Sequence, residues 1–84
     1  MKTLTVYSTA MCTHCKSAKQ FLNELAIPYN EVNLNEDAAA MDFVRSRGHR
    51  SVPQIYVGET QFVAGWAELS RMTKESILER LQEE

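Results

Sequence analysis

The order of the first 34 residues constrains the fold of this chain more than any other feature. Residues 2–8 alternate between apolar and polar side chains, as a half-buried strand does. Apolar residues then recur at three- and four-residue steps over residues 15–25, which is typical of an amphipathic helix that Pro28 ends. Residues 29–34 predict a second strand. A strand–helix–strand unit joins two parallel strands by a right-handed crossover.

The rest of the chain predicts further helices. Either Asn35 or Asp37 caps a helix over residues 38–47, which ends at Gly48. The apolar stripe of the last helical region consists of Leu69, Met72, Ile77, Leu78 and Leu81. In that region either Thr73 caps a fresh helix or one kinked helix continues.

Two more strands lie between these helices. Residues 54–57 and 61–64 predict strands joined by a tight turn at Gly58-Glu59, and Gly65 breaks the second of them. The predicted order is β-α-β-α-β-β-α. We therefore expect an α/β fold with a four-stranded mixed sheet flanked by helices.

Length and composition limit the classes of protein to which the chain can belong. Its 84 residues have room for one domain, residues 1–84, with a thin core. The charged share of 24% is ordinary for a globular protein, and a net charge of −2 gives no reason to expect nucleic-acid binding. No apolar run approaches the roughly 20 residues that cross a bilayer, and no signal-peptide pattern is visible. We expect a cytoplasmic protein without a membrane partner.

The chain has two cysteines, Cys12 and Cys15, with two residues between them. A disulfide between them would close almost no loop, so it would constrain the unfolded chain very little. A secreted domain of this size usually carries several disulfides. Redox chemistry therefore explains the pair better than stability does, and two ordinary buried cysteines are the competing interpretation.

The position of the pair suits thiol–disulfide exchange. Cys12 follows a predicted strand and begins a predicted helix, whose N-terminus carries partial positive charge that stabilises a thiolate. Residues three apart lie on one helical face, within disulfide range. We predict that Cys12 attacks and that Cys15, a turn deeper, resolves the mixed disulfide. His14 is either a proton donor or cation for Cys12, or an exposed residue that tunes the redox potential.

A metal site is the next alternative. Structural zinc takes four ligands, usually as two separated pairs. Here Cys12, His14 and Cys15 are crowded together, and His49 is the one distant candidate. We expect no metal site within one chain, while a site shared between two chains stays open.

Several motifs of this chain recur together in a known family. They are Val6-Tyr7-Ser8 leading to Cys12-Thr13-His14-Cys15, then Ser51-Val52-Pro53-Gln54-Ile55-Tyr56-Val57, then Ala64-Gly65 with Leu69 beyond. With them the chain resembles the glutaredoxins and their thioredoxin-fold relatives, including the small redoxins that reduce ribonucleotide reductase. The match covers essentially the whole chain. The resemblance implies a thioredoxin-like fold.

The resemblance also implies a binding site for the tripeptide glutathione. Pro53 is expected to be cis and to lie beside Cys12, leaving the Val52 backbone to pair with an extended substrate. Arg50 is expected to bind a carboxylate of the tripeptide and Glu68 its ammonium group. Gly65 is expected to let the tripeptide backbone come close, because it has no Cβ. The implied substrate-binding residues are Thr13, His14, Arg50, Val52, Pro53, Gly65 and Glu68.

Some positions depart from the glutaredoxin pattern. Thr13 and His14 stand where Pro and Tyr are usual, Thr9 replaces a common Lys, and Ala67 replaces the first residue of an acidic pair. Each departure weakens the implied glutathione site. The electron donor is therefore either glutathione or a thioredoxin reductase. Trp66 is either a contact for a partner or a packing residue.

The expected function is that of a dithiol glutaredoxin-like oxidoreductase, an enzyme that reduces protein disulfides or glutathione mixed disulfides through Cys12 and Cys15. The alternative is a dimeric carrier or sensor of a glutathione-ligated [2Fe–2S] cluster. We expect glutathione as a co-substrate, no tightly bound cofactor, and a monomer. Expected partners are glutathione or thioredoxin reductase as electron donor and a disulfide-bearing protein such as ribonucleotide reductase.

Overall fold

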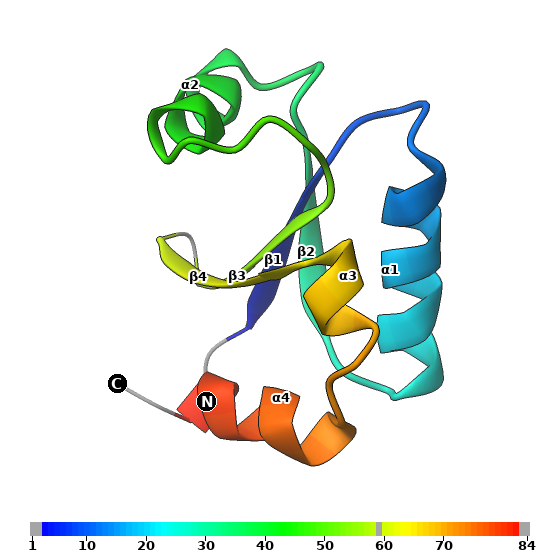
Figure 1. The fold of residues 1–84 in the computed structure, drawn as a ribbon. Helices are drawn as coiled ribbons and strands as arrows, with labels where there is room; N and C mark the ends of the chain where they lie inside the picture. Colours follow the sequence, from blue (N-terminus) through cyan, green and yellow to red (C-terminus); the bar gives the residue numbers. More distant parts are fainter. Residues whose placement is uncertain (1–2, 59, 83–84) are drawn as a thin grey trace.

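A four-stranded mixed sheet forms the centre of the molecule (Figure 1). The computed structural model describes residues 3–58 and 60–82. The strands follow the spatial order β2-β1-β3-β4, with β1 parallel to β2, β3 antiparallel to β1, and β4 antiparallel to β3. Their bounds are β1 Leu4–Ser8, β2 Tyr29–Asn33, β3 Gln54–Val57 and β4 Gln61–Gly65. The predicted α/β class and mixed sheet are confirmed.

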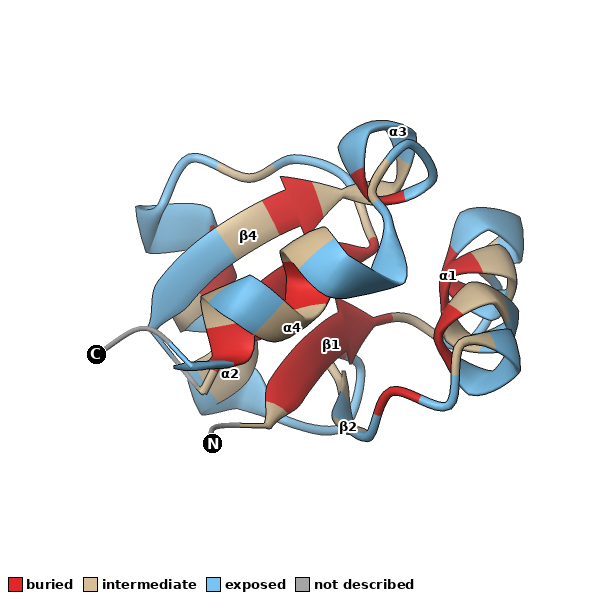
Figure 2. Ribbon diagram, turned by 90° about the horizontal axis from the view of Figure 1, so that it is seen from below, coloured by how far each residue is buried: buried red, intermediate tan, exposed pale blue. Residues whose placement is uncertain are grey.

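Helices lie on both faces of this sheet (Figure 1). One core cluster joins the sheet to α1, α3 and α4, and a second joins the other face to α2. The helix bounds are α1 Thr13–Glu24, α2 Ala38–Ser46, α3 Trp66–Leu69 and α4 Lys74–Gln82. Because both faces are covered, every residue of β1 is buried (Figure 2).

The end of α1 differs from the expectation that Pro28 ends it. The helix stops at Glu24, and the Ile27 N–H donates back to the Leu22 carbonyl at 3.0 Å. Ala26 adopts the left-handed conformation, with φ of 57°. This left-handed residue turns the chain before Pro28 is reached.

The start of α2 resolves the choice of cap. The Asp37 carboxylate accepts a hydrogen bond from the Ala40 N–H at 3.0 Å, which satisfies one unpaired donor of the first turn. Asn35 lies before the helix, and its N–H donates to the Asn33 side chain. The helix ends just before Gly48, which takes a positive φ of 83° that costs glycine little.

The last helical region consists of two helices, not one kinked helix. The Thr73 hydroxyl accepts a hydrogen bond from the Ser76 N–H at 3.1 Å, so Thr73 begins α4 as one of the two alternatives predicted. The short helix α3 directly after β4 was not predicted as a separate element. The described order is therefore β-α-β-α-β-β-α-α.

The connection between β3 and β4 is longer than the predicted two-residue turn. Val57 pairs with Gln61, with residues 58–60 between them. Gly58 takes a positive φ of 64°. The predicted turn partner Glu59 lies outside the described residues.

Three strand ends meet at the edge of the sheet where Cys12 lies. The register pairs Tyr7 with Gln54 and Gln54 with Gly65. The segment after β1 therefore emerges beside the segment before β3 and the end of β4. This arrangement brings residues some forty positions apart in sequence to one place.

We predict that Leu22→Ala lowers the free energy of unfolding by about 2–5 kcal/mol, because Leu22 is fully buried where α1 meets the sheet. Urea denaturation followed by circular dichroism measures the change. The matched control is Asn23→Ala, on the exposed side of the same turn, which should stay within about 0.5 kcal/mol. Equal effects of the two substitutions would contradict the assignment of this face to the core.

Candidate active site

Cys12 occupies the N-cap position of α1. Its backbone is extended, with φ −112° and ψ 112°, and its Sγ accepts a hydrogen bond from the Cys15 N–H at 3.1 Å. Side-chain oxygens usually satisfy the first N–H groups of a helix, and here a sulfur does so. The partly exposed Cys12 sulfur thus sits where a helix start favours negative charge.

Cys15 has a different environment, although both cysteines are free thiols. Its side chain is 1% exposed. Burial, followed by the hydrogen bond with Cys12, raises the pKa of Cys15 to about 12 from an ordinary value of 9.0. Cys15 is therefore protonated at neutral pH, and of the pair only Cys12 is open to solvent.

The Val52–Pro53 peptide bond is cis, as the family resemblance implied. The Cys12 thiol donates a hydrogen bond to the Val52 carbonyl, with the sulfur and oxygen 3.6 Å apart. The cis peptide thus lies directly beside Cys12.

A groove of about 420 Å³ runs past this cis peptide. Five of the predicted substrate-binding residues line it, namely His14, Val52, Pro53, Gly65 and Glu68. The other residues that line it are His49, Ser51, Gln54, Phe62, Trp66 and Ala67. The groove brings together residues from α1, the segment before β3, and the end of β4.

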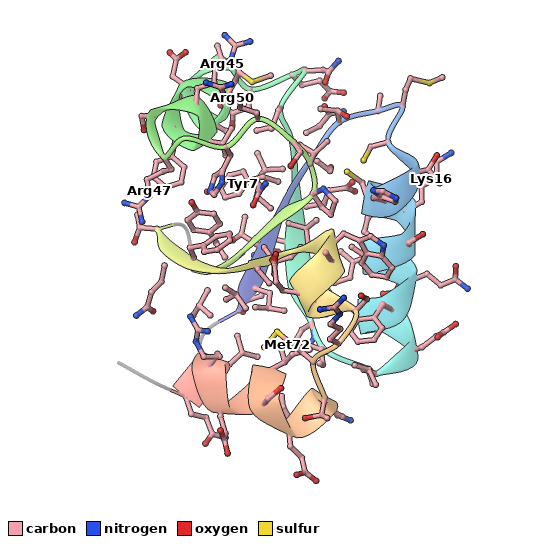
Figure 3. The ribbon with its side chains drawn as sticks, in the orientation of Figure 1. Tyr7, Lys16, Arg45, Arg47, Arg50 and Met72 are labelled. Atoms are coloured by element: carbon pink, nitrogen blue, oxygen red, sulfur yellow. The ribbon has the colours of Figure 1, made fainter. Side chains whose placement is uncertain are left out.

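Two predicted residues lie outside the groove lining. Arg50 lines a neighbouring pocket of about 240 Å³, which shares His49, Ser51 and Val52 with the groove. Thr13 is exposed on the first turn of α1. Figure 3 shows Arg50 beside Arg45 at the end of α2.

Glu68 already has a partner at the end of the groove. Its carboxylate accepts a hydrogen bond from the Gly65 N–H at 3.2 Å. A Cβ on Gly65 would meet the Glu68 carboxylate and the Pro53 carbonyl at 3.8 Å, which is ordinary contact. The protein alone does not require glycine here, so any requirement would come from a bound molecule.

Two ring side chains that line the groove, His49 and Phe62, were not predicted as substrate-binding residues. His49 Nε2 lies 2.7 Å from the hydroxyl of the fully buried Tyr56, and its ring lies 5.1 Å from that of Phe62, which is 40% exposed. Burial, and then the charge of Arg47, lowers the pKa of His49. His49 lies four residues before Pro53, in the same segment as the predicted Arg50, and this position was the one sequence signal that it lines the groove. Trp66 packs edge-to-face on Phe21 and also lines the groove.

Within residues 3–58 and 60–82, no group of three or more His, Cys, Asp or Glu side chains is placed to hold a metal ion. In the same residues no helix has the length and apolar character needed to span a bilayer.

Comparison with known proteins decides the family. The glutaredoxin family model matches residues 4–63. A glutaredoxin of Neisseria meningitidis serogroup A is 34% identical over 83 residues, covering 96% of each chain. The chain belongs to the glutaredoxin family. With both cysteines of its CxxC pair close together, this glutaredoxin is a dithiol thiol–disulfide oxidoreductase.

A second group of relatives is also similar. The glutaredoxin-like protein NrdH of Lactococcus lactis subsp. cremoris is 38% identical over 52 residues, which cover 62% of this chain and 72% of that protein. The alternative function, a [2Fe–2S] carrier, receives no specific support from these relatives.

Solved structures establish the thioredoxin-like fold. The holo form of glutaredoxin C1 from Populus tremula x tremuloides has a TM-score of 0.77 and 22% identity, over 96% of this chain and 84% of that one. A buckwheat glutaredoxin–glutathione complex has a TM-score of 0.70 and 20% identity, over 95% of this chain and 73% of that one.

We predict that iodoacetamide at neutral pH alkylates Cys12 and leaves Cys15 unmodified in the folded protein, because Cys15 is buried and its pKa is about 12. Peptide mass spectrometry after timed quenching measures both sites. In urea both cysteines should react at similar rates. Comparable labelling of both in the folded protein would contradict the described burial of Cys15.

Proposed function

We propose that Cys12 is the attacking thiolate and Cys15 the resolving thiol of this oxidoreductase. The observation that carries the proposal is the Cys15 N–H bound to the partly exposed sulfur of Cys12, beside a groove, while Cys15 itself is buried. Attack by a thiolate needs access, and the second thiol needs only to reach the first.

The proposed cycle has two exchange steps. Cys12 attacks a disulfide, the substrate S–S bond breaks, a Cys12–substrate disulfide forms, and the released thiolate takes up a proton. Cys15 then attacks the Cys12 sulfur, and its proton goes to the second released thiolate. The resulting Cys12–Cys15 disulfide accepts two electrons from an external thiol donor.

We propose glutathione as the co-substrate that occupies the groove. Glutaredoxins use glutathione as a substrate, and one relative of this fold was solved in complex with it. We assign Val52 the pairing with the tripeptide backbone, Glu68 the ammonium group, and Arg50, in the adjoining pocket, a carboxylate. Pro53 and Gly65 shape the wall between them, and Thr13 and His14 flank Cys12.

A thioredoxin reductase is the competing electron donor. The similarity to the glutaredoxin-like protein NrdH supports it, as do Thr13 and His14 in place of the usual Pro and Tyr. The disulfide substrate is a protein, with ribonucleotide reductase as one candidate. We further propose that residues 1–84 are one glutaredoxin-like domain, monomeric and cytoplasmic, without a tightly bound cofactor.

We predict that Cys12→Ser abolishes reduction of every disulfide substrate, because no accessible thiolate remains. Cys15→Ser should lose reduction of protein disulfides and keep reduction of a glutathione mixed disulfide, since a second glutathione can release Cys12. Both variants are assayed by NADPH oxidation with glutathione plus glutathione reductase, and again with thioredoxin reductase.

The assays with the two electron sources distinguish glutathione from thioredoxin reductase as the electron donor. Turnover with glutathione alone identifies a glutathione-linked enzyme, and turnover with thioredoxin reductase alone identifies the other donor. Full activity of Cys12→Ser, or no turnover of the native protein with either source, contradicts the proposed function.

We predict that Glu68→Gln raises the KM for a glutathione mixed disulfide about five- to tenfold with little change in kcat. A hydrogen bond to a charged group contributes about 1.5–3 kcal/mol and a neutral one about 0.5–1.5 kcal/mol, so Gln, which keeps the shape without the charge, loses about 1–1.5 kcal/mol. Glu79→Gln, on the exposed face of α4, is the matched control. Unchanged KM in Glu68→Gln would remove this residue from the substrate site.

A further inference from the structure

The buried state of Cys15 poses a chemical problem that the proposed cycle must solve. Cys15 attacks as a thiolate, yet its surroundings favour the protonated thiol. In the mixed disulfide the Cys12 sulfur is bonded to substrate and carries no charge. The part of the raised pKa that comes from Cys12 is then lost, but burial still disfavours the Cys15 thiolate, so a nearby cation would speed the second step.

Lys19 lies one helical turn beyond Cys15 on α1. Residues four apart share a helical face, and Ala18 between them is buried against the sheet. The Lys19 side chain reaches across to β2, where its Nζ lies 2.8 Å from a Glu31 carboxylate oxygen. Burial, and then Cys12, raises the pKa of Cys15, and the charge of Lys19 acts in the opposite direction as a smaller contribution. Lys19 thus places a positive charge one helical turn from the buried thiol.

Glu31, the partner of Lys19, is itself held in place by Ser8. The same oxygen of Glu31 accepts a hydrogen bond from the Ser8 hydroxyl at 2.8 Å, and Ser8 is 1% exposed at the end of β1. The next residue, Thr9, contributes a backbone hydrogen bond to Cys15. One continuous set of contacts therefore runs from β1 and β2 to the underside of the active-site helix.

We propose that Lys19, held by Glu31 and Ser8, stabilises the Cys15 thiolate as it attacks the mixed disulfide on Cys12. In this step the Cys12–substrate S–S bond breaks and the Cys12–Cys15 bond forms. The proton of Cys15 ends on the released thiolate, and Lys19 keeps its charge throughout. Glu31 and Ser8 are positioning residues that act through Lys19. The inference rests on the proposed roles of Cys12 and Cys15.

Stability alone gives little reason for this arrangement. The side chains of Lys19 and Glu31 are 29% and 39% exposed, and ion pairs this open contribute little to folding. Lys16 offers a comparison, because it directly follows Cys15 and points out from α1, away from the sheet (Figure 3). Two lysines of one helix thus differ in whether they face the buried thiol.

The test separates the two exchange steps in one stopped-flow experiment with the reduced native protein. Dithiobis(nitrobenzoate) is an aromatic disulfide whose released thiolate is coloured. Attack by Cys12 releases one thiolate at a rate proportional to reagent concentration. Attack by Cys15 on the resulting mixed disulfide releases the second at a rate independent of that concentration. The variants are Lys19→Met, Lys19→Arg and Glu31→Gln, with Lys16→Met as the matched control.

We expect Lys19→Met to slow the second phase about threefold at neutral pH and to move its pH profile upward. Loss of the cation raises the pKa of Cys15, which lowers the thiolate fraction tenfold per unit, while the greater nucleophilicity of the thiolate returns about threefold. The other groups that face this pair are Cys12, Tyr29 and Glu31, and none of them is changed in Lys19→Met.

The remaining variants decide between electrostatics and structure. Lys19→Arg should restore the second phase to within about twofold, and Glu31→Gln should slow it less than Lys19→Met does. Lys16→Met should leave it within about twofold, and the first phase should stay within about twofold in all Lys19 and Glu31 variants, which shows an intact site.

Three results overturn the inference: an unchanged second phase in Lys19→Met, an equal effect of Lys16→Met, or equal slowing of both phases. Failure of the proposed function itself looks different. In that case the native protein lacks the concentration-independent phase, or Cys12→Ser keeps the first phase.

Discussion

The hydrogen bond from the Cys15 N–H to the Cys12 sulfur is the contact on which the site depends. It fixes the Cys12 side chain at the first turn of α1, where the unpaired N–H groups of the helix favour negative charge. Cys15 lies three residues after Cys12, on the same side of the helix and one turn further along, and its side chain is buried in the core. One helical turn therefore gives two chemically equal thiols unequal access to solvent.

The sheet supplies the other half of the site. β3 lies antiparallel to both β1 and β4, so the end of β1, the start of β3 and the end of β4 share one edge. These three strand ends carry the parts of the site, namely Cys12 after β1, the cis peptide before β3, and Gly65 at the end of β4. Their separation is set by backbone pairing and by fully buried side chains such as Ile55. The reactive sulfur can therefore stay at the surface, because the core elsewhere stabilises the fold.

Local patterns in the sequence predicted most of the elements. The strands, the Asp37 cap and the Thr73 start of a new helix each depend on neighbours within a few residues. The family resemblance predicted the cis peptide at Pro53. Features that depend on tertiary context were less visible, and α3, which was not predicted as a separate helix, is too short to show a periodic pattern. Arg50 is close in sequence to Val52 and Pro53, which line the groove, but it lines the adjoining pocket. The packing around a loop side chain decides its direction, and the sequence does not show that packing.

The contribution of Phe62 to the groove shows why such residues escape sequence reasoning. Regular pairing from Ile55 and Ala64 would place Val63 opposite Tyr56, yet the register shifts there and pairs Tyr56 with Phe62. A shift of one residue turns a side chain to the other face of a strand. The Phe62 ring consequently lies 5.4 Å from that of Tyr56 and packs against His49, which Tyr56 also holds through its hydroxyl. The irregular pairing thus places the Phe62 ring in the wall of the groove beside Pro53. The alternation of apolar and polar residues in β4 does not predict this position.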